Sequence, residues 1–181
     1  MPSPAPNAVE SSPSGAPQLQ EPVTQCGVNN PLLEEIVVKQ SHVQGLNVNL
    51  VCALIMAESS FNPKAVSAQG KIGLLQLDPA LAQKTAADQA LPWEGAERLK
   101  DPEYNLKIGL PRLKALLEKY PDDQELALLA FNLGEDLAAK IKRGERSLPP
   151  LAARYLKNIR KFYKSFDQSS SMKNFTASIS E

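Results

Sequence analysis

The chain has 181 residues, enough for one domain with terminal tails, and its hydrophobic fraction of 43% suffices for a buried core. Lys+Arg and Asp+Glu number 20 each, so a net charge of zero excludes a strongly basic or strongly acidic protein. No apolar run is long enough to span a membrane, and the N-terminus lacks the regions of a signal peptide, which leaves a cytoplasmic protein or a chain without its leader.

Two polar segments flank the predicted domain. Residues 1–26 are rich in proline and serine, with six prolines in the first 22 positions, and cannot bury enough apolar surface to offset their ordering entropy. Residues 167–181 begin with Asp167, Gln168 and three serines and are predicted to be a second disordered tail. The globular domain is therefore placed at residues 27–166.

Helix-start signals divide this domain into a series of helices, and no segment alternates like a strand. The predicted starts are Asn30-Pro31, Asn47, Asp78-Pro79, Asp101-Pro102, a capping box of Asp122 and Glu125, and Pro149-Pro150. Pro111 lies inside the fourth helix, where we expect a kink or a fresh start. Gly134 and Gly144 are expected to end helices. The fold class is mainly α, with a glycine-containing loop between Asn62 and Leu77.

Glu58 interrupts the apolar face of the second predicted helix. Apolar residues from Leu50 to Ala57 mark a face that belongs in a core, and one further step places a carboxylate on it. Burial disfavours the charged form, so the pKa of Glu58 should rise, as a general acid requires near neutral pH. The alternative is a helix-end glutamate that reaches water past Ser59.

The segment after Glu58 has a specific pattern of residues. It consists of Glu-Ser, Phe-Asn-Pro, Ala-x-Ser, two glycines three apart, and Leu-x-Gln-hydrophobic-x-Pro. The residues in this pattern are Glu58, Ser59, Phe61, Asn62, Pro63, Ala65, Ser67, Gly70, Gly73, Leu74, Gln76 and Pro79. The pattern resembles the signature of the soluble lytic transglycosylase (SLT) domain, which has a goose-type-lysozyme-like fold.

Weaker matches follow in the family's order, so the resemblance covers roughly residues 44–164. The downstream matches are Asn105, Gly109, Leu113, Ala130, Asn132, Gly134, Pro149, Tyr155 and Leu156. The departures from the family pattern are Lys71 and Leu75 in the loop, and Phe131, Leu133 and Glu135 near the end of a helix.

The resemblance implies that Glu58 is catalytic and that seven residues bind substrate. These are Ser59, Ser67, Gly73, Gln76, Phe131, Asn132 and Tyr155. Each could also have an ordinary structural role: serines and glycines form turns, and Tyr155 lies on the apolar face of the last helix. Gln76 offers two donors and an acceptor, which suit sugar hydroxyls and acetamido groups. Asn132 lies among apolar residues near a helix end, where a buried amide needs partners.

The implied reaction uses one carboxylate. Glu58 protonates the glycosidic oxygen between N-acetylmuramic acid and N-acetylglucosamine of peptidoglycan, and then takes the C6 hydroxyl proton as a 1,6-anhydro ring closes. The substrate's acetamido group stabilises the cationic centre, and no metal or organic cofactor is required. This substrate implies a periplasmic or exported protein, and we expect a monomer. Asp78 is the only other carboxylate inside the signature, and helix capping accounts for it.

Three alternatives remain open at this point. The departures at Phe131, Leu133 and Glu135 leave room for a non-catalytic glycan-binding module. A second carboxylate that positions water would make the protein a lysozyme-type hydrolase, and the candidates for it are Asp78, Glu94, Glu97, Asp101 and Glu135. Nine Lys/Arg and one acid between Lys140 and Lys164 could bind an anionic wall polymer or envelope surface, or form a solvated face. No nucleic-acid motif accompanies them, so no nucleic acid is expected.

The two cysteines, Cys26 and Cys52, allow either one disulfide or two buried thiols. An oxidising compartment favours the disulfide, which would tie the entry of the first helix to the helix of Glu58. No Cys/His cluster has metal-ligand spacing, so no metal site is predicted, and His42 is expected at the surface.

Overall fold

The computed structural model describes residues 26–177, including the side chains of residues 26–167. The elements in chain order are α1 (Pro31–Gln44), α2 (Val48–Ser59), α3 (Pro79–Asp88), the 3-10 helix η1 (Ala96–Lys100), α4 (Pro102–Lys119), α5 (Gln124–Leu133), α6 (Glu135–Lys142) and α7 (Pro150–Ala177). No strand occurs among the described residues, where the loop after α2 forms only isolated bridges of Ile72 with Val66 and Leu77. The mainly α fold class is confirmed.

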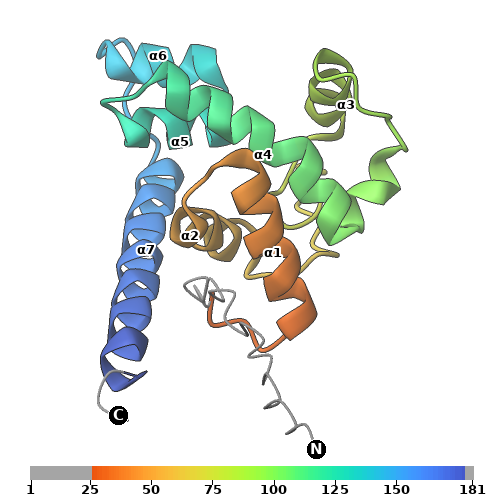
Figure 1. Ribbon diagram of the computed structural model, residues 1–181. Coiled ribbons are helices and arrows are strands. Elements are labelled where there is room, and N and C mark those ends of the chain that lie inside the picture. Colours follow the sequence, from red (N-terminus) through yellow and green to blue (C-terminus); the bar gives the residue numbers. More distant parts are fainter. Residues whose placement is uncertain (1–25, 178–181) are drawn as a thin grey trace, which may run out of the picture.

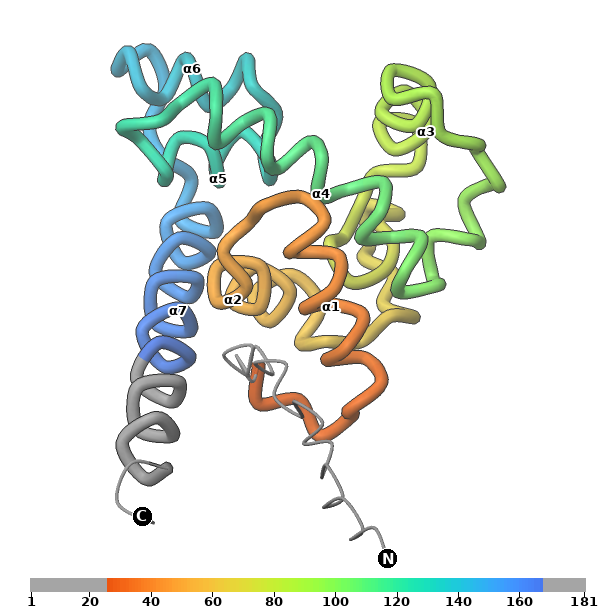
Figure 2. Tube along the Cα trace, viewed as in Figure 1, coloured from red at the N-terminus to blue at the C-terminus, as the bar shows by residue number. Residues whose placement is uncertain are grey.

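The helix that carries Glu58 lies inside the bundle. Figure 1 shows α2 between α7 and α1, with α4, α5 and α6 crossing above them. α2 packs against both α7 and α1, and α5 contacts α4, α6 and α7. Every residue from Val48 to Ile55 is buried, and all of these residues except Asn49 are apolar. The Cα trace in Figure 2 shows the loop after α2 passing beneath α4 toward α3.

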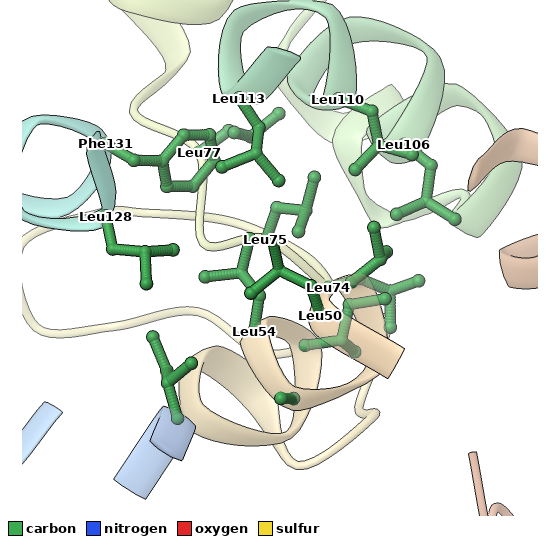
Figure 3. Packing of buried hydrophobic residues seen from close by; sticks show 14 of the residues in the cluster. Leu50, Leu54, Leu74, Leu75, Leu77, Leu106, Leu110, Leu113, Leu128 and Phe131 are labelled. Carbon is green, nitrogen blue, oxygen red and sulfur yellow. The ribbon is translucent and has the colours of Figure 1, made fainter. Parts of the chain in front are cut away.

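The core joins this loop to the helices around it. Leu74, Leu75 and Leu77 from the loop are buried with side chains of α2, α4 and α5, as Figure 3 shows. Fully burying a leucine side chain stabilises a fold by about 1.5–3 kcal/mol. The loop is therefore held from below by its own apolar residues, which fixes the position of the polar residues between them.

Most predicted helix starts are confirmed by side-chain caps. The side chains of Asn30, Asn47, Asp78 and Asp101 each accept a hydrogen bond from a backbone N–H of the first turn. The predicted cap at Asp122 is wrong by one residue, because Asp123 accepts from the Leu126 N–H. α4 continues through Pro111 as a single helix.

Both predicted domain boundaries need correction. Cys26, placed in the disordered segment, is 1% exposed and forms a disulfide with Cys52, so the ordered domain includes it. The rest of that segment, residues 1–25, lies outside the described residues. The predicted tail at residues 167–181 is wrong up to Ala177, because α7 continues to that residue. After Pro150, no proline or glycine interrupts the chain up to Ala177, and serine has only a moderately lower helix propensity than alanine, so three serines in a row do not end the helix.

None of the helices within residues 26–177 combines the length and the apolar composition needed to cross a bilayer. His42 is exposed, as predicted.

Candidate active site

Glu58 lies in the last turn of α2, where the chain turns sharply into the loop. Ser60 ends the helix in the left-handed conformation with φ 51°, and Phe61 follows with φ 59° and a buried ring. The Glu58 side chain is half-buried. Desolvation raises the pKa of Glu58 above its usual range, which favours a protonated carboxyl that can act as a general acid.

Polar groups from three other elements surround this carboxyl. Asn132 Nδ2, at the end of α5, donates to Glu58 Oε1 over 3.4 Å. Tyr155 from α7 and Lys71 from the loop favour the carboxylate, so Tyr155, Lys71 and Asn132, in that order, lower the Glu58 pKa against the larger effect of burial. Glu58 therefore has partners for its charged form while its neutral form remains accessible.

Tyr155 is the most buried of these partners. Its hydroxyl forms no hydrogen bond of standard geometry within residues 26–167 and makes a polar contact with Glu58. Burial raises the pKa of the Tyr155 hydroxyl well above its usual range, and the Glu58 carboxylate raises it further. Tyr155 is therefore a neutral hydroxyl, suited to donate a hydrogen bond to Glu58 or to substrate.

Asn105 of α4 holds the loop that follows Glu58. Its side chain is fully buried, and its Oδ1 accepts from Leu75 N–H at 3.0 Å. Its Nδ2 donates to Ile72 O at 3.1 Å and Leu99 O at 2.9 Å. Gly73 lies against this amide with φ 81°, and a Cβ there would lie 2.2 Å from Asn105 Nδ2. Only glycine therefore fits between Asn105 and the loop backbone.

Ser59 and Gln76 hold the two ends of the same loop. Ser59 Oγ donates to Leu74 O at 2.9 Å and also approaches Ile55 O at 3.2 Å. Gln76 adopts φ 46°, and its Nε2 donates to Gly73 O at 2.9 Å and Ala65 O at 3.3 Å. These bonds turn the Gln76 side chain back over the loop, where it stays half-buried beside Glu58.

Two cavities meet at Glu58. The larger, about 510 Å³, extends along the loop to α7 and is lined by Ser67, Gln69, Arg154 and Tyr155 among others. The smaller, about 180 Å³, extends toward α3 and α4 and is lined by Asp78, Arg112 and Phe131 among others. The residues that line both are Glu58, Lys71, Gln76, Asn132 and Leu133. An elongated ligand can therefore pass over Glu58 with a binding region on either side.

No second carboxylate is poised for catalysis among the candidates from the sequence. Of the residues that line the two cavities, only Glu58 and Asp78 carry carboxylates. Asp78 Oδ1 accepts from Leu81 N–H at 2.9 Å as the cap of α3. Glu135 pairs with Lys119. The other candidates are also engaged: Glu94 with Arg98, Glu97 with Lys100, and Asp101 as the cap of α4.

Comparison with known proteins identifies the family. The model of the transglycosylase SLT domain matches residues 35–150, more than half of the chain. The chain belongs to this family. The SLT domain is 31% identical over 121 residues to membrane-bound lytic murein transglycosylase C of Serratia proteamaculans, covering 62% of this chain and 34% of that protein. It is 33% identical over 104 residues to the transglycosylase of Enterobacteria phage PRD1, covering 58% and 36%.

Solved structures share the fold of this SLT domain. The lytic transglycosylase Slt from Pseudomonas aeruginosa has a TM-score of 0.68 at 22% identity, covering 75% of this chain and 24% of that one. A soluble lytic murein transglycosylase of Salmonella typhimurium is 27% identical over 101 residues, which is 16% of its length. This chain therefore spans about a third or less of the length of the Serratia, Pseudomonas and Salmonella proteins. The predicted lysozyme-like fold and the resemblance to the family are confirmed.

Five of the predicted binding residues line the cavities of the SLT domain beside Glu58. These are Ser67, Gln76, Phe131, Asn132 and Tyr155. The other two, Ser59 and Gly73, line neither cavity, and their bonds instead anchor the loop. Contact of any of the seven with a glycan stays a prediction.

Two cations at the site were not predicted. Arg112 donates to Phe131 O and Ala130 O at 3.0 Å each, and its guanidinium lies 5.0 Å from the centre of the Phe131 ring. Burial lowers the pKa of Arg112. From the sequence, Lys71 is identified only as a departure from the family pattern, although a charged residue between two loop glycines indicates a role at the site. Arg112 could be inferred from its place on the α4 face that carries Asn105 and Gly109.

Within residues 26–167, no group of three or more His, Cys, Asp and Glu side chains could hold a metal ion. Four of the nine cations between Lys140 and Lys164 form ion pairs: Lys140 with Asp136, Lys142 with Asp123, Arg143 with Glu145, and Arg160 with Glu125. Such exposed pairs contribute little stability but reduce the net positive charge of the surface. Binding of this stretch to the envelope stays a prediction.

Proposed function

We propose that this SLT domain cleaves the β-1,4 bond between N-acetylmuramic acid and N-acetylglucosamine in peptidoglycan by lytic transglycosylation. The observation that carries the proposal is the single carboxylate with a raised pKa at the meeting point of two cavities. A glycan strand lies along both cavities, so that the scissile bond is over Glu58. The substrate places the activity outside the cytoplasmic membrane.

Glu58 acts first as the acid. Its proton passes to the glycosidic oxygen, the bond from that oxygen to C1 of the muramic acid breaks, and the substrate's acetamido group stabilises the positive charge at C1. The resulting Glu58 carboxylate is stabilised by the Asn132 amide, the Tyr155 hydroxyl and the Lys71 charge. The negative charge therefore develops where these groups already stand, which lowers the barrier.

Glu58 acts next as the base. The carboxylate takes the proton of the C6 hydroxyl, and that oxygen bonds to C1, which closes the 1,6-anhydro ring and returns Glu58 to its protonated state. No water is consumed. A hydrolase of the usual two-carboxylate type would need a second carboxylate for water or for a covalent intermediate. Asp78, the other carboxylate at the cavities, is occupied as a helix cap.

Paired variants test this assignment. Glu58→Gln keeps the shape of the side chain but cannot donate a proton, so release of soluble fragments from purified peptidoglycan should fall by about 10²–10⁴-fold. Asp78→Asn is the matched control, because asparagine caps a helix as well as aspartate does, and it should keep activity within a few-fold. More than a tenth of wild-type activity in Glu58→Gln, or inactivation by Asp78→Asn, would contradict the proposal.

A further inference from the structure

Lys71 links two parts of the site that are far apart in sequence. It follows Gly70 in the loop, and its Nζ donates to Asn132 O at 3.1 Å across 61 residues of sequence. The loop fixes the Lys71 backbone, because Lys71 N donates to Ser67 Oγ at 3.1 Å and Lys71 O accepts from Ser67 N at 2.9 Å. The ammonium group therefore reaches the end of α5 from a backbone position that is fixed by hydrogen bonds.

The last turn of α5 presents its carbonyl groups to the active site. The final carbonyls of a helix lack partners within the helix and carry partial negative charge. Arg112 binds two of them, Ala130 O and Phe131 O, and Lys71 binds the next, Asn132 O. Two cations from different elements thus bind three consecutive carbonyls of α5, and the third of these carbonyls belongs to Asn132.

The positive charge of the same side chain acts on Glu58. Lys71 lines both cavities with Glu58, and its charge favours the Glu58 carboxylate. The other titratable or charged side chains lining the two cavities are Asp78 at the start of α3, Arg112 on α4, and Arg154 and Tyr155 on α7. Of these, Arg112 is committed to its two carbonyls and Asp78 to its cap.

We propose that Lys71 is a positioning residue that holds the last turn of α5, and with it the Asn132 amide, against Glu58 while keeping a positive charge beside the carboxylate. The inference rests on the proposed function, because the charge matters most when Glu58 has given up its proton. Lys71 then stabilises the anion formed in the first step, and its loss slows that step more than it weakens binding of the glycan.

Three variants separate the roles of Lys71. Lys71→Met removes the charge and the bond but keeps the length of the chain. Lys71→Arg keeps the charge, and Lys64→Met removes an exposed charge from the same loop as the matched control. For each, kcat and KM are measured on soluble glycan strands across a pH series, and the Glu58 carboxyl is titrated by carbon-13 NMR.

The charge predicts a specific pattern. In Lys71→Met, kcat should fall about tenfold with little change in KM. The NMR midpoint of Glu58 and the alkaline limb of kcat/KM should both move to higher pH, because the carboxylate has lost a stabilising charge. Lys71→Arg should keep the wild-type midpoint, and Lys64→Met should match wild type throughout.

An unchanged or lower Glu58 midpoint in Lys71→Met would overturn the proposal, even if activity falls, because the lost charge and a displaced Asn132 amide should both raise that midpoint. The NMR titration needs no turnover. It therefore decides the role of Lys71 even if the wild-type protein releases no glycan fragments, which would refute the proposed function separately.

Discussion

Replacing Asn105 by alanine should destabilise the domain by about 4 kcal/mol. The substitution leaves the Leu75 N–H buried without a partner, at about 1–3 kcal/mol, and removes bonds to two carbonyls, at about 0.5–1.5 kcal/mol each. Ile72 O keeps its bond from Leu77 N–H at 3.0 Å, so the lower part of that range applies to it. A loss of this size is a large part of the roughly 5–15 kcal/mol that stabilises a typical domain.

Asn105→Asp distinguishes lost hydrogen bonds from lost volume. Aspartate has nearly the same size as asparagine and can still accept from Leu75 N–H. However, it places an oxygen where Nδ2 donates to Ile72 O and Leu99 O. Two carbonyls then face a buried carboxylate, so Asn105→Asp should be at least as destabilising as Asn105→Ala.

The measurement is urea-induced unfolding at pH 7 with the disulfide intact, followed by circular dichroism. Asn62→Ala is the control, because Asn62 Oδ1 accepts from Lys64 N–H at 3.0 Å in an exposed turn, where water can replace it, and should lose less than about 1 kcal/mol. Near-wild-type stability of Asn105→Asp, or a loss below about 1 kcal/mol in Asn105→Ala, would refute this role of Asn105 in the loop.

Three further changes test other parts of the structure. Gly73→Ala should cost about 2–5 kcal/mol by urea unfolding, because it adds left-handed strain to a steric clash, whereas Gly70→Ala meets no atom within 4 Å and should cost only about 1–2 kcal/mol. Replacing Cys26 and Cys52 by serine opens a disulfide that spans 26 residues and should lower the free energy of unfolding by about 3.5 kcal/mol. An unchanged free energy of unfolding would argue against the disulfide. In thermal melts, Glu58→Gln should be more stable than wild type at pH 7–8 but not below about pH 4. Because the pKa of Glu58 is raised, the native state holds the proton more tightly than the unfolded chain, so wild-type stability falls as pH rises through that interval. A stability difference that stays constant across pH would contradict the raised pKa.

The elements of the fold that local chemistry determines were predictable from sequence. Asn30, Asn47 and Asp101 act as caps because each side chain satisfies a backbone N–H only a few residues away. The raised pKa of Glu58 was predictable because a carboxylate on an apolar helix face loses hydration. Asp122 and Asp123 differ by a single position, and only the geometry of the turn before α5 selects Asp123.

The contacts made across the fold were not predictable in the same way. The bond from Lys71 to Asn132 O joins residues 61 apart, and no local pattern indicates which carbonyl a lysine will reach. The role of Asn105 in holding the loop also depends on α4 crossing it. For Ser59 the family pattern predicted a role in substrate binding, but in the structure its hydroxyl donates a hydrogen bond to Leu74 O.

The source of the oxygen in the products tests the central claim most directly. The claim is that Glu58 alone moves both protons and that the C6 hydroxyl, rather than water, attacks C1. Peptidoglycan is digested in water enriched in oxygen-18, and the soluble fragments are analysed by mass spectrometry. We predict fragments that end in 1,6-anhydro-N-acetylmuramic acid, each about one water lighter than a hydrolytic product and without the label. Labelled reducing-end fragments would contradict the account, because they would show that water enters the site and attacks C1.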